Sequence, residues 1–161
     1  MRCVCVCALV FAVVAPSCSK PETPSGPSAN AAVIVARAPA AVAARACSGC
    51  GVNSAELEAA VDLVVEETAG VAGQITAVDV VLRTGSVVIA GPGQFDAAAV
   101  TTFGGGTNRV PARGSLTLRS IGMHFDPQFR AQLPATLTMV VRFRDDRGNT
   151  SSTDVAVQVT T

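Results

Sequence analysis

Residues 136–160 read TLTMVVRFRDDRGNTSSTDVAVQVT, and this stretch decides the fold class. Every second residue from Leu137 to Phe143 is apolar, which places these side chains on one face of a strand. The alternation returns from Val155 to Val159. Between the two runs, residues 145–149 supply turn-forming side chains and a glycine that tolerates positive φ. The stretch therefore predicts a β-hairpin with one buried face.

Further apolar runs outside this hairpin predict more strands. Residues 76–84 alternate, with Thr76 and Leu82 at the two ends of the inner face. In residues 115–125 the apolar phase slips by one residue near Arg119 and Ser120, which is typical of a β-bulge.

Residues 33–46 hold two short apolar runs broken at Pro39. Proline lacks the N–H that a central strand needs, so this segment is expected to be an edge strand that passes from one sheet to the other.

Two segments are harder to assign. Read as a strand, residues 54–67 place alternate apolar side chains on one face; read as a helix, they start at a Ser54 cap and stop at Gly70. The surrounding strands favour the first interpretation. Residues 91–114 are the longest irregular stretch, with one expected helical turn over 96–100.

About seven short strands separated by turns predict an all-β fold, an immunoglobulin-like antiparallel β-sandwich. Three segments, VVEETAGVAG (64–73), RVPARGSLTL (109–118) and VVRFRDDRGN (140–149), resemble parts of Ig-like domains in uncharacterised bacterial surface lipoproteins. The resemblance covers most of residues 55–161. It implies a sandwich and no catalytic residue, because these segments encode turns and strands.

The first eighteen residues predict the destination of the protein. Arg2 precedes an uncharged apolar run over 3–15, too short to span a bilayer, so residues 1–17 are expected to be a signal peptide. The junction Ala15-Pro16-Ser17-Cys18 resembles the lipobox of bacterial lipoproteins. That resemblance implies a lipid on Cys18 and attachment to a membrane through this anchor, with Ser19 favouring the outer membrane. The alternative is an ordinary secretory signal, which leaves a periplasmic or secreted protein.

Residues 18–30 are rich in proline and serine and poor in apolar groups, so they predict a disordered tether between the lipid and the folded domain over 31–161. Cleavage before Cys18 removes one of the 12 basic residues, Arg2, and none of the 12 acidic ones. The mature chain then has a net charge of about −1, which argues against nucleic-acid binding because no basic surface charge remains in excess.

Cys47 and Cys50 are the only cysteines left after Cys18 is lipidated. In an oxidising compartment they predict a disulfide. A redox-active dithiol or a metal site remain alternatives, although a CxxC motif alone lacks the four ligands of structural zinc.

His124, the one histidine, lies in an alternating run and is expected to point outward. Oxygens of Asp145, Asp146 and Asn149 suit calcium, but a tight turn needs the same residues for backbone reasons. No catalytic residue, metal or cofactor is predicted.

These observations predict a lipid-anchored, exported Ig-like domain with a non-catalytic binding or structural role at the bacterial cell envelope. Its partner would be a protein or a polysaccharide that meets its loops or an edge strand. The alternative is an exported thiol-disulfide redox or metal-handling protein that uses Cys47 and Cys50.

Overall fold

The computed structural model describes residues 31–47 and 56–161. These residues form ten strand segments, one α-helix and one 3₁₀ helix. In chain order they are β1 (Ile34–Arg37), β2 (Ala41–Ala43), β3 (Arg45–Ala46), β4 (Leu57–Glu67), β5 (Gly73–Thr84), β6 (Val87–Asp96), α1 (Ala97–Phe103), β7 (Arg109–Val110), β8 (Ser115–Phe125), the 3₁₀ helix Pro127–Gln132, β9 (Ala135–Asp145) and β10 (Thr150–Thr160).

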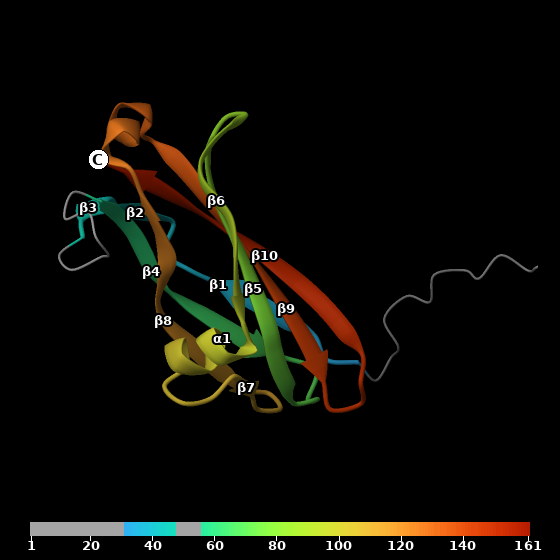
Figure 1. Ribbon diagram of the computed structural model, residues 1–161. Coiled ribbons are helices and arrows are strands. Elements are labelled where there is room, and N and C mark those ends of the chain that lie inside the picture. The colour runs from blue at the N-terminus through green and yellow to red at the C-terminus, as the bar shows by residue number, and fades with distance from the viewer. Residues whose placement is uncertain (1–30, 48–55) are drawn as a thin grey trace, which may run out of the picture.

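The strands form two sheets that face each other (Figure 1). In the first sheet, β4 pairs with β1, β3 and β8. The second sheet has the order β2-β10-β9-β5-β6, with β7 added to β5. All pairings are antiparallel except that of β2 with β10. This is the strand order of an immunoglobulin-like sandwich, and the predicted fold class is confirmed.

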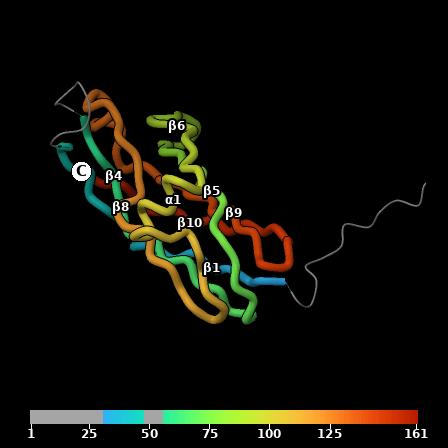
Figure 2. Tube along the Cα trace, turned by 60° about the horizontal axis from the view of Figure 1, so that its bottom comes forward, coloured from blue at the N-terminus to red at the C-terminus, as the bar shows by residue number. Residues whose placement is uncertain are grey.

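The first strand is divided between the sheets, as predicted from Pro39. Its first part, β1, pairs with β4, and its second part, β2, runs parallel to β10. The tube view shows this segment passing along the side of the molecule from one layer to the other (Figure 2). Counted with the divided strand as one, and without the two-residue segments β3 and β7, the described chain has seven strands.

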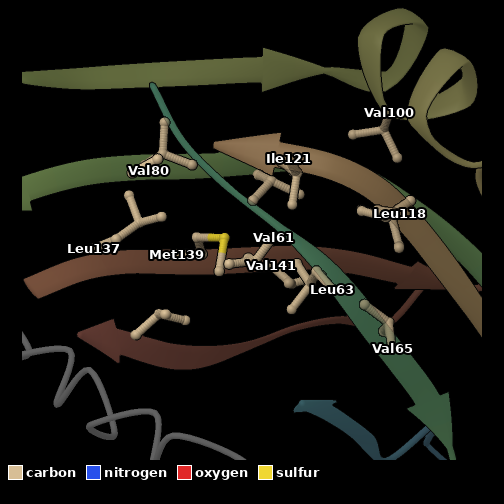
Figure 3. Close-up of a cluster of buried hydrophobic side chains, with 14 of the residues drawn as sticks. Val61, Leu63, Val65, Val80, Val100, Leu118, Ile121, Leu137, Met139 and Val141 are labelled. Carbon is tan, nitrogen blue, oxygen red and sulfur yellow. The ribbon is translucent and has the colours of Figure 1, made fainter. Parts of the chain in front are cut away.

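Apolar side chains from both sheets fill the space between them (Figure 3). The first sheet contributes Leu63 and Leu118, and the second contributes Leu137 and Met139, all fully buried. Burying such a side chain contributes roughly 1.5–3 kcal/mol, so this interior stabilises the sandwich without any aromatic residue of the Trp or Tyr type.

Residues 57–67 form the long strand β4, so the strand interpretation of 54–67 is confirmed over its described part and the helix interpretation is wrong. Odd-numbered residues from Leu57 to Glu67 are buried, whereas the even-numbered residues between them are less buried or exposed. The two-residue period of a strand explains this pattern.

The predicted β-bulge lies in β8. The pairing of β4 with β8 shifts between Val61 and Leu63, and Ser120 has a φ of 52°. Asp62 Oδ1 accepts a hydrogen bond from the Ser120 backbone N–H at 3.0 Å, which holds the bulged residue in place. In β5 a similar shift between Ile75 and Ala77 turns Thr76 outward, so the expected inward position of Thr76 was wrong.

The expectation of an irregular stretch over 91–114 was only partly right. Residues 91–96 complete β6, and α1 follows directly. The Asp96 side chain caps this helix by accepting from the Ala99 N–H at 2.9 Å. Edge-to-face contact between Phe95 and Phe103, with ring centroids 5.0 Å apart, holds α1 against the end of β6.

Candidate functional site

The described chain enters the sandwich at one end, where three turns meet. These turns, residues 68–72, 109–114 and 144–149, are called the arginine end below. Backbone hydrogen bonds join them: Asp146 N–H donates to the Ala72 carbonyl, and Glu67 N–H donates to the Gly114 carbonyl, both at 2.9 Å. In Figure 1 they lie at the bottom of the molecule, opposite the tip of the β5–β6 hairpin.

Glu67, at the end of β4, is 1% exposed and organises two of these turns. Its carboxylate accepts backbone N–H bonds from Ala69 and Gly70 at 2.8 Å, Arg113 at 2.9 Å, Val71 at 3.1 Å and Val33 at 3.3 Å. Burial raises the pKa of Glu67, but these N–H donors together outweigh it and lower the pKa from 4.5 to about 2. A charged carboxylate therefore joins the start of β1 to the β4–β5 and β7–β8 turns.

Asp145 does the same for the β9–β10 turn. Its carboxylate accepts from the backbone N–H groups of Asn149 at 2.8 Å, Arg147 at 2.9 Å and Ala32 at 3.2 Å, and from the Asn149 side chain at 2.9 Å. Burial raises the pKa of Asp145, and the hydrogen bonds from Asn149, Ala32 and Arg147 bring it below its usual value. The carboxylate thus has the turn-forming role that was one of its two predicted interpretations.

Four exposed arginines lie at the arginine end: Arg109, Arg113, Arg144 and Arg147. Asp146 binds Arg109 through two bonds, at 2.6 and 3.1 Å, and this pairing raises the pKa of Arg109. The backbones of Arg113 and Arg147 are fixed by Glu67 and Asp145 respectively. The buried carboxylates therefore fix the backbone positions of Arg113 and Arg147.

Two open grooves lie on the outer face of the second sheet beside this end. The first, of about 570 Å³, is lined by Gln74, Thr76, Arg144, Asp145, Asp146, Arg147 and Gly148. The second, of about 390 Å³, is lined by Thr76, Arg142, Phe143, Thr150, Ser151 and Ser152. The first lining combines two guanidinium groups with the carboxylates of Asp145 and Asp146, whereas hydroxyl groups and one guanidinium dominate the second. Guanidinium and hydroxyl groups recognise anionic oxygens.

A polar network on the same face borders the second groove. Asp79 accepts hydrogen bonds from Gln94 Nε2 at 2.6 Å and from Arg142 Nε at 2.7 Å. These two bonds, first that of Gln94 and then that of Arg142, lower the pKa of Asp79. The network fixes the Arg142 side chain across three strands, β6, β5 and β9.

The predicted cysteine site lies at the opposite end of the sandwich. Cys47 follows β3 and is 7% exposed, with its Sγ 3.9 Å from His124 Nε2. On the other side of the imidazole ring, His124 Nδ1 is 4.0 Å from Glu56 Oε2. The His124 side chain is half-exposed, in agreement with its predicted outward orientation. No pattern in the sequence indicates that Cys47, His124 and Glu56 lie close together.

Cys18 and Cys50 lie outside the described residues, so lipid attachment and the Cys47–Cys50 pairing stay predictions. Within residues 31–47 and 56–161, no three His, Cys, Asp or Glu side chains are grouped in a way that would hold a metal ion. No helix in this part of the chain is long and apolar enough to cross a bilayer.

No protein-family model matches the chain, and no curated protein matches it. Among solved structures, the chain is similar to that of murine CRIg, with a TM-score of 0.39 and 17% sequence identity. The match covers 80% of this chain and 97% of the CRIg chain. A likeness of this degree carries no argument about ligand or activity, and the immunoglobulin-like assignment comes from the strand order.

Proposed function

We propose that the protein is a lipid-anchored, exported immunoglobulin-like domain with a non-catalytic binding role at the cell envelope. The observation that most supports this proposal is the end of the sandwich at which the described chain begins. Ala32 and Val33, near the start of the described residues, are hydrogen-bonded to Asp145 and Glu67 at the arginine end. A tether from Cys18 would therefore reach the domain at this end and leave the other end for a partner.

The far end offers features that suit a protein or polysaccharide partner. The β5–β6 hairpin projects beyond the sandwich there (Figure 1) and exposes Val87 and Val88, which are 50% and 38% accessible. In the described sheet, β6 is the last strand and pairs only with β5. Its open edge has backbone groups to which an extended segment of a partner protein would add as a further strand.

Metabolic labelling with a palmitate analogue in a bacterial host tests the anchor. We expect label in the wild type and in Cys47→Ala, and no label in Cys18→Ala, because only the thiol at the predicted cleavage site would receive diacylglycerol. Cys47→Ala is the matched control, since it removes a cysteine of the mature chain without touching the signal. An unlabelled wild type would refute the anchor and leave a periplasmic or secreted protein.

A second candidate function, thiol-disulfide exchange by Cys47 and Cys50, is favoured by the position of His124. An imidazolium beside a cysteine sulfur stabilises the thiolate over the thiol, and so makes a disulfide easier to reduce. In this arrangement the Cys47–Cys50 dithiol would reduce a disulfide of a partner protein and become a disulfide itself, and the Cys47–Cys50 disulfide would oxidise a partner's dithiol in the reverse direction.

Redox titration of the mature chain against glutathione tests this candidate. We expect His124→Phe to make the reduction potential more negative by on the order of 20 mV, since roughly 1 kcal/mol of thiolate stabilisation is lost. Arg45→Gln, a nearby exposed change, should leave the potential unchanged. If the pair stays oxidised throughout in the wild type, it is a structural disulfide and the redox function is wrong.

A further inference from the structure

We propose that the outer face of the second sheet is a surface through which two copies of this chain form a symmetric dimer. This surface, called the outer sheet face below, consists of the outward side chains of β10, β9 and β5, which lie side by side in that order (Figure 1). The inference goes beyond the proposed function, because it needs neither the lipid anchor nor the β5–β6 hairpin. It is carried by the positions of two opposite charges, Arg83 and Asp154, around an apolar centre.

The centre of the outer sheet face consists of small and β-branched side chains. Val81, Thr138 and Val140 are partly buried, and Ala156 is exposed. Thr138 pairs with Val81 on one side and with Ala156 on the other, and Val140 follows two residues later in β9. The solvent face of an antiparallel sheet is usually polar, so the two valines are out of place there unless something covers them. With no long side chain at its centre, this surface can be approached closely by a second sheet.

Two opposite charges border this centre. Arg83 and Asp154 are exposed, and no salt bridge includes either of them in the part of the chain that the structure describes. Two other charges of this face, Asp79 and Arg142, are joined to each other at 2.6 Å. Arg144, the next cation along β9, lies toward the arginine end. Arg83 and Asp154 are therefore available to charges on another molecule.

The register of the strands places these two charges symmetrically about Thr138. Arg83 pairs with Thr136, and Asp154 pairs with Val140. In β9, Thr136 is two residues before Thr138 and Val140 is two residues after it. Since β5 and β10 flank β9 on opposite sides, Arg83 and Asp154 lie in opposite directions from Thr138. Each Cα is about 8 Å from that of Thr138, from the usual spacing of strands and of residues along a strand.

A second copy of the chain fits this arrangement. Two outer sheet faces can meet about a two-fold axis that passes over Thr138, at right angles to the line from Arg83 to Asp154. Each Arg83 then faces Asp154 of its partner, and each Val81 lies close to Val140 of its partner. The interface has two ion pairs around an apolar centre, and its strands cross at a steep angle, as in orthogonal sheet packing. Like charges at both positions would instead repel the second copy.

Analytical ultracentrifugation tests the proposal on the full mature chain, residues 18–161, with Cys18→Ala. Sedimentation is measured over a wide range of protein concentrations. We expect a monomer–dimer equilibrium, because the self-complementary face buries apolar side chains and forms each ion pair twice. A chain that remains monomeric up to its highest soluble concentration would overturn the proposal. Since the probe lacks the thiol of Cys18, this result is separate from the palmitate labelling, and a monomer would leave the anchor and the binding role as they stand.

Charge reversal locates the dimer contact. Arg83→Asp alone and Asp154→Arg alone should each weaken dimerisation roughly 25-fold, about fivefold for each of the two contacts, because like charges then face each other. The double variant Arg83→Asp/Asp154→Arg should restore the dimer, since both pairs are again opposite and the net charge is that of the wild type. The control Arg119→Asp, at an exposed position of β8 in the other sheet, changes the net charge as Arg83→Asp does and should leave dimerisation unchanged.

The same measurements can refute this surface. Failure of the folded double variant to dimerise, or an equal loss in Arg119→Asp, would show that Arg83 and Asp154 do not meet across the interface. A dimer that is unaffected by Arg83→Asp but lost in Val87→Lys would place the contact at the open edge of β6, and the outer sheet face would be wrong. Circular dichroism and urea unfolding confirm that each variant is folded.

Discussion

Glu67→Gln is expected to lower the free energy of unfolding by about 3 kcal/mol near neutral pH, from the difference between a pKa of 4.5 unfolded and about 2 folded. The glutamine side chain keeps the size of glutamate but presents one N–H₂ group to backbone donors that need an acceptor. The backbone N–H groups of Ala69, Gly70, Val71 and Arg113 then compete for one oxygen. Urea unfolding measures the loss.

The pH dependence gives this prediction a second readout. Because the folded pKa is depressed, the stabilisation by Glu67 is fully present above pH 4.5 and is lost as the pH falls through about 2. Unfolding free energies measured across this window should drop more steeply in the wild type than in Glu67→Gln. Asp145, whose pKa is also lowered, contributes to the drop in both proteins.

Glu66→Gln is the matched control. Glu66 is next in sequence, but its side chain points outward and is 37% exposed, with Arg37 at 3.0 Å. An exposed ion pair contributes roughly 0–1 kcal/mol. Similar losses in Glu66→Gln and Glu67→Gln would contradict the role given to the buried carboxylate.

Gly122→Ala is expected to destabilise the sandwich by about 3 kcal/mol, the upper end of the usual cost of overpacking. A Cβ at this position in β8 would overlap the carbonyl oxygen of Ala59 and lie 2.6 Å from the Cα of Ala60. Both atoms belong to the backbone of β4, which is held in the centre of its sheet and has no flexible end to move. Thermal or urea unfolding of the variant measures the effect.

Gly93→Ala provides the control for Gly122. Gly93 also lies in a strand, β6, but a Cβ there would meet Val80 Cγ2 at 3.4 Å, an ordinary contact. We expect a change below about 1 kcal/mol, because a strand position with room for a methyl group tolerates alanine. If the two alanine variants were equally stable, the close approach of β8 to β4 would be wrong.

The strands were predictable where the alternation of side chains was regular. The hairpin over 136–160 follows directly from a two-residue period, and the slip at Arg119 and Ser120 located the bulge. The segment that forms β4 also fitted a helical period, so its strand assignment came from the surrounding strands. Thr76 was misplaced because a register shift in β5 interrupts the period without an apolar signal. The local alternation of side chains therefore predicts the strands of both sheets, but not every register shift within them.

The sequence analysis missed the role of Glu67 and gave Asp145 a turn-forming role as one of two interpretations, although a signal for both buried acids was present. Glu67 and Asp145 each continue the inward phase of a buried strand by one more position, where an acid is out of place. Their role depends on donors as distant as Arg113 and Ala32, which local periodicity does not bring together. The contact between Cys47 Sγ and His124 Nε2 could not be predicted for the same reason.

The division of the first strand between two sheets has a mechanical consequence. If the chain is anchored as proposed, a pull from the anchor would reach the described residues at Ala32, and β1 and β2 both run from there toward the far end, paired with β4 and β10. When a partner holds the far end, the force acts along these strands, and their hydrogen bonds carry the load in shear, together rather than one after another. Glu67 and Asp145 hold Ala32 and Val33 where such a force would arrive, so an anchored domain would resist being peeled open from that point.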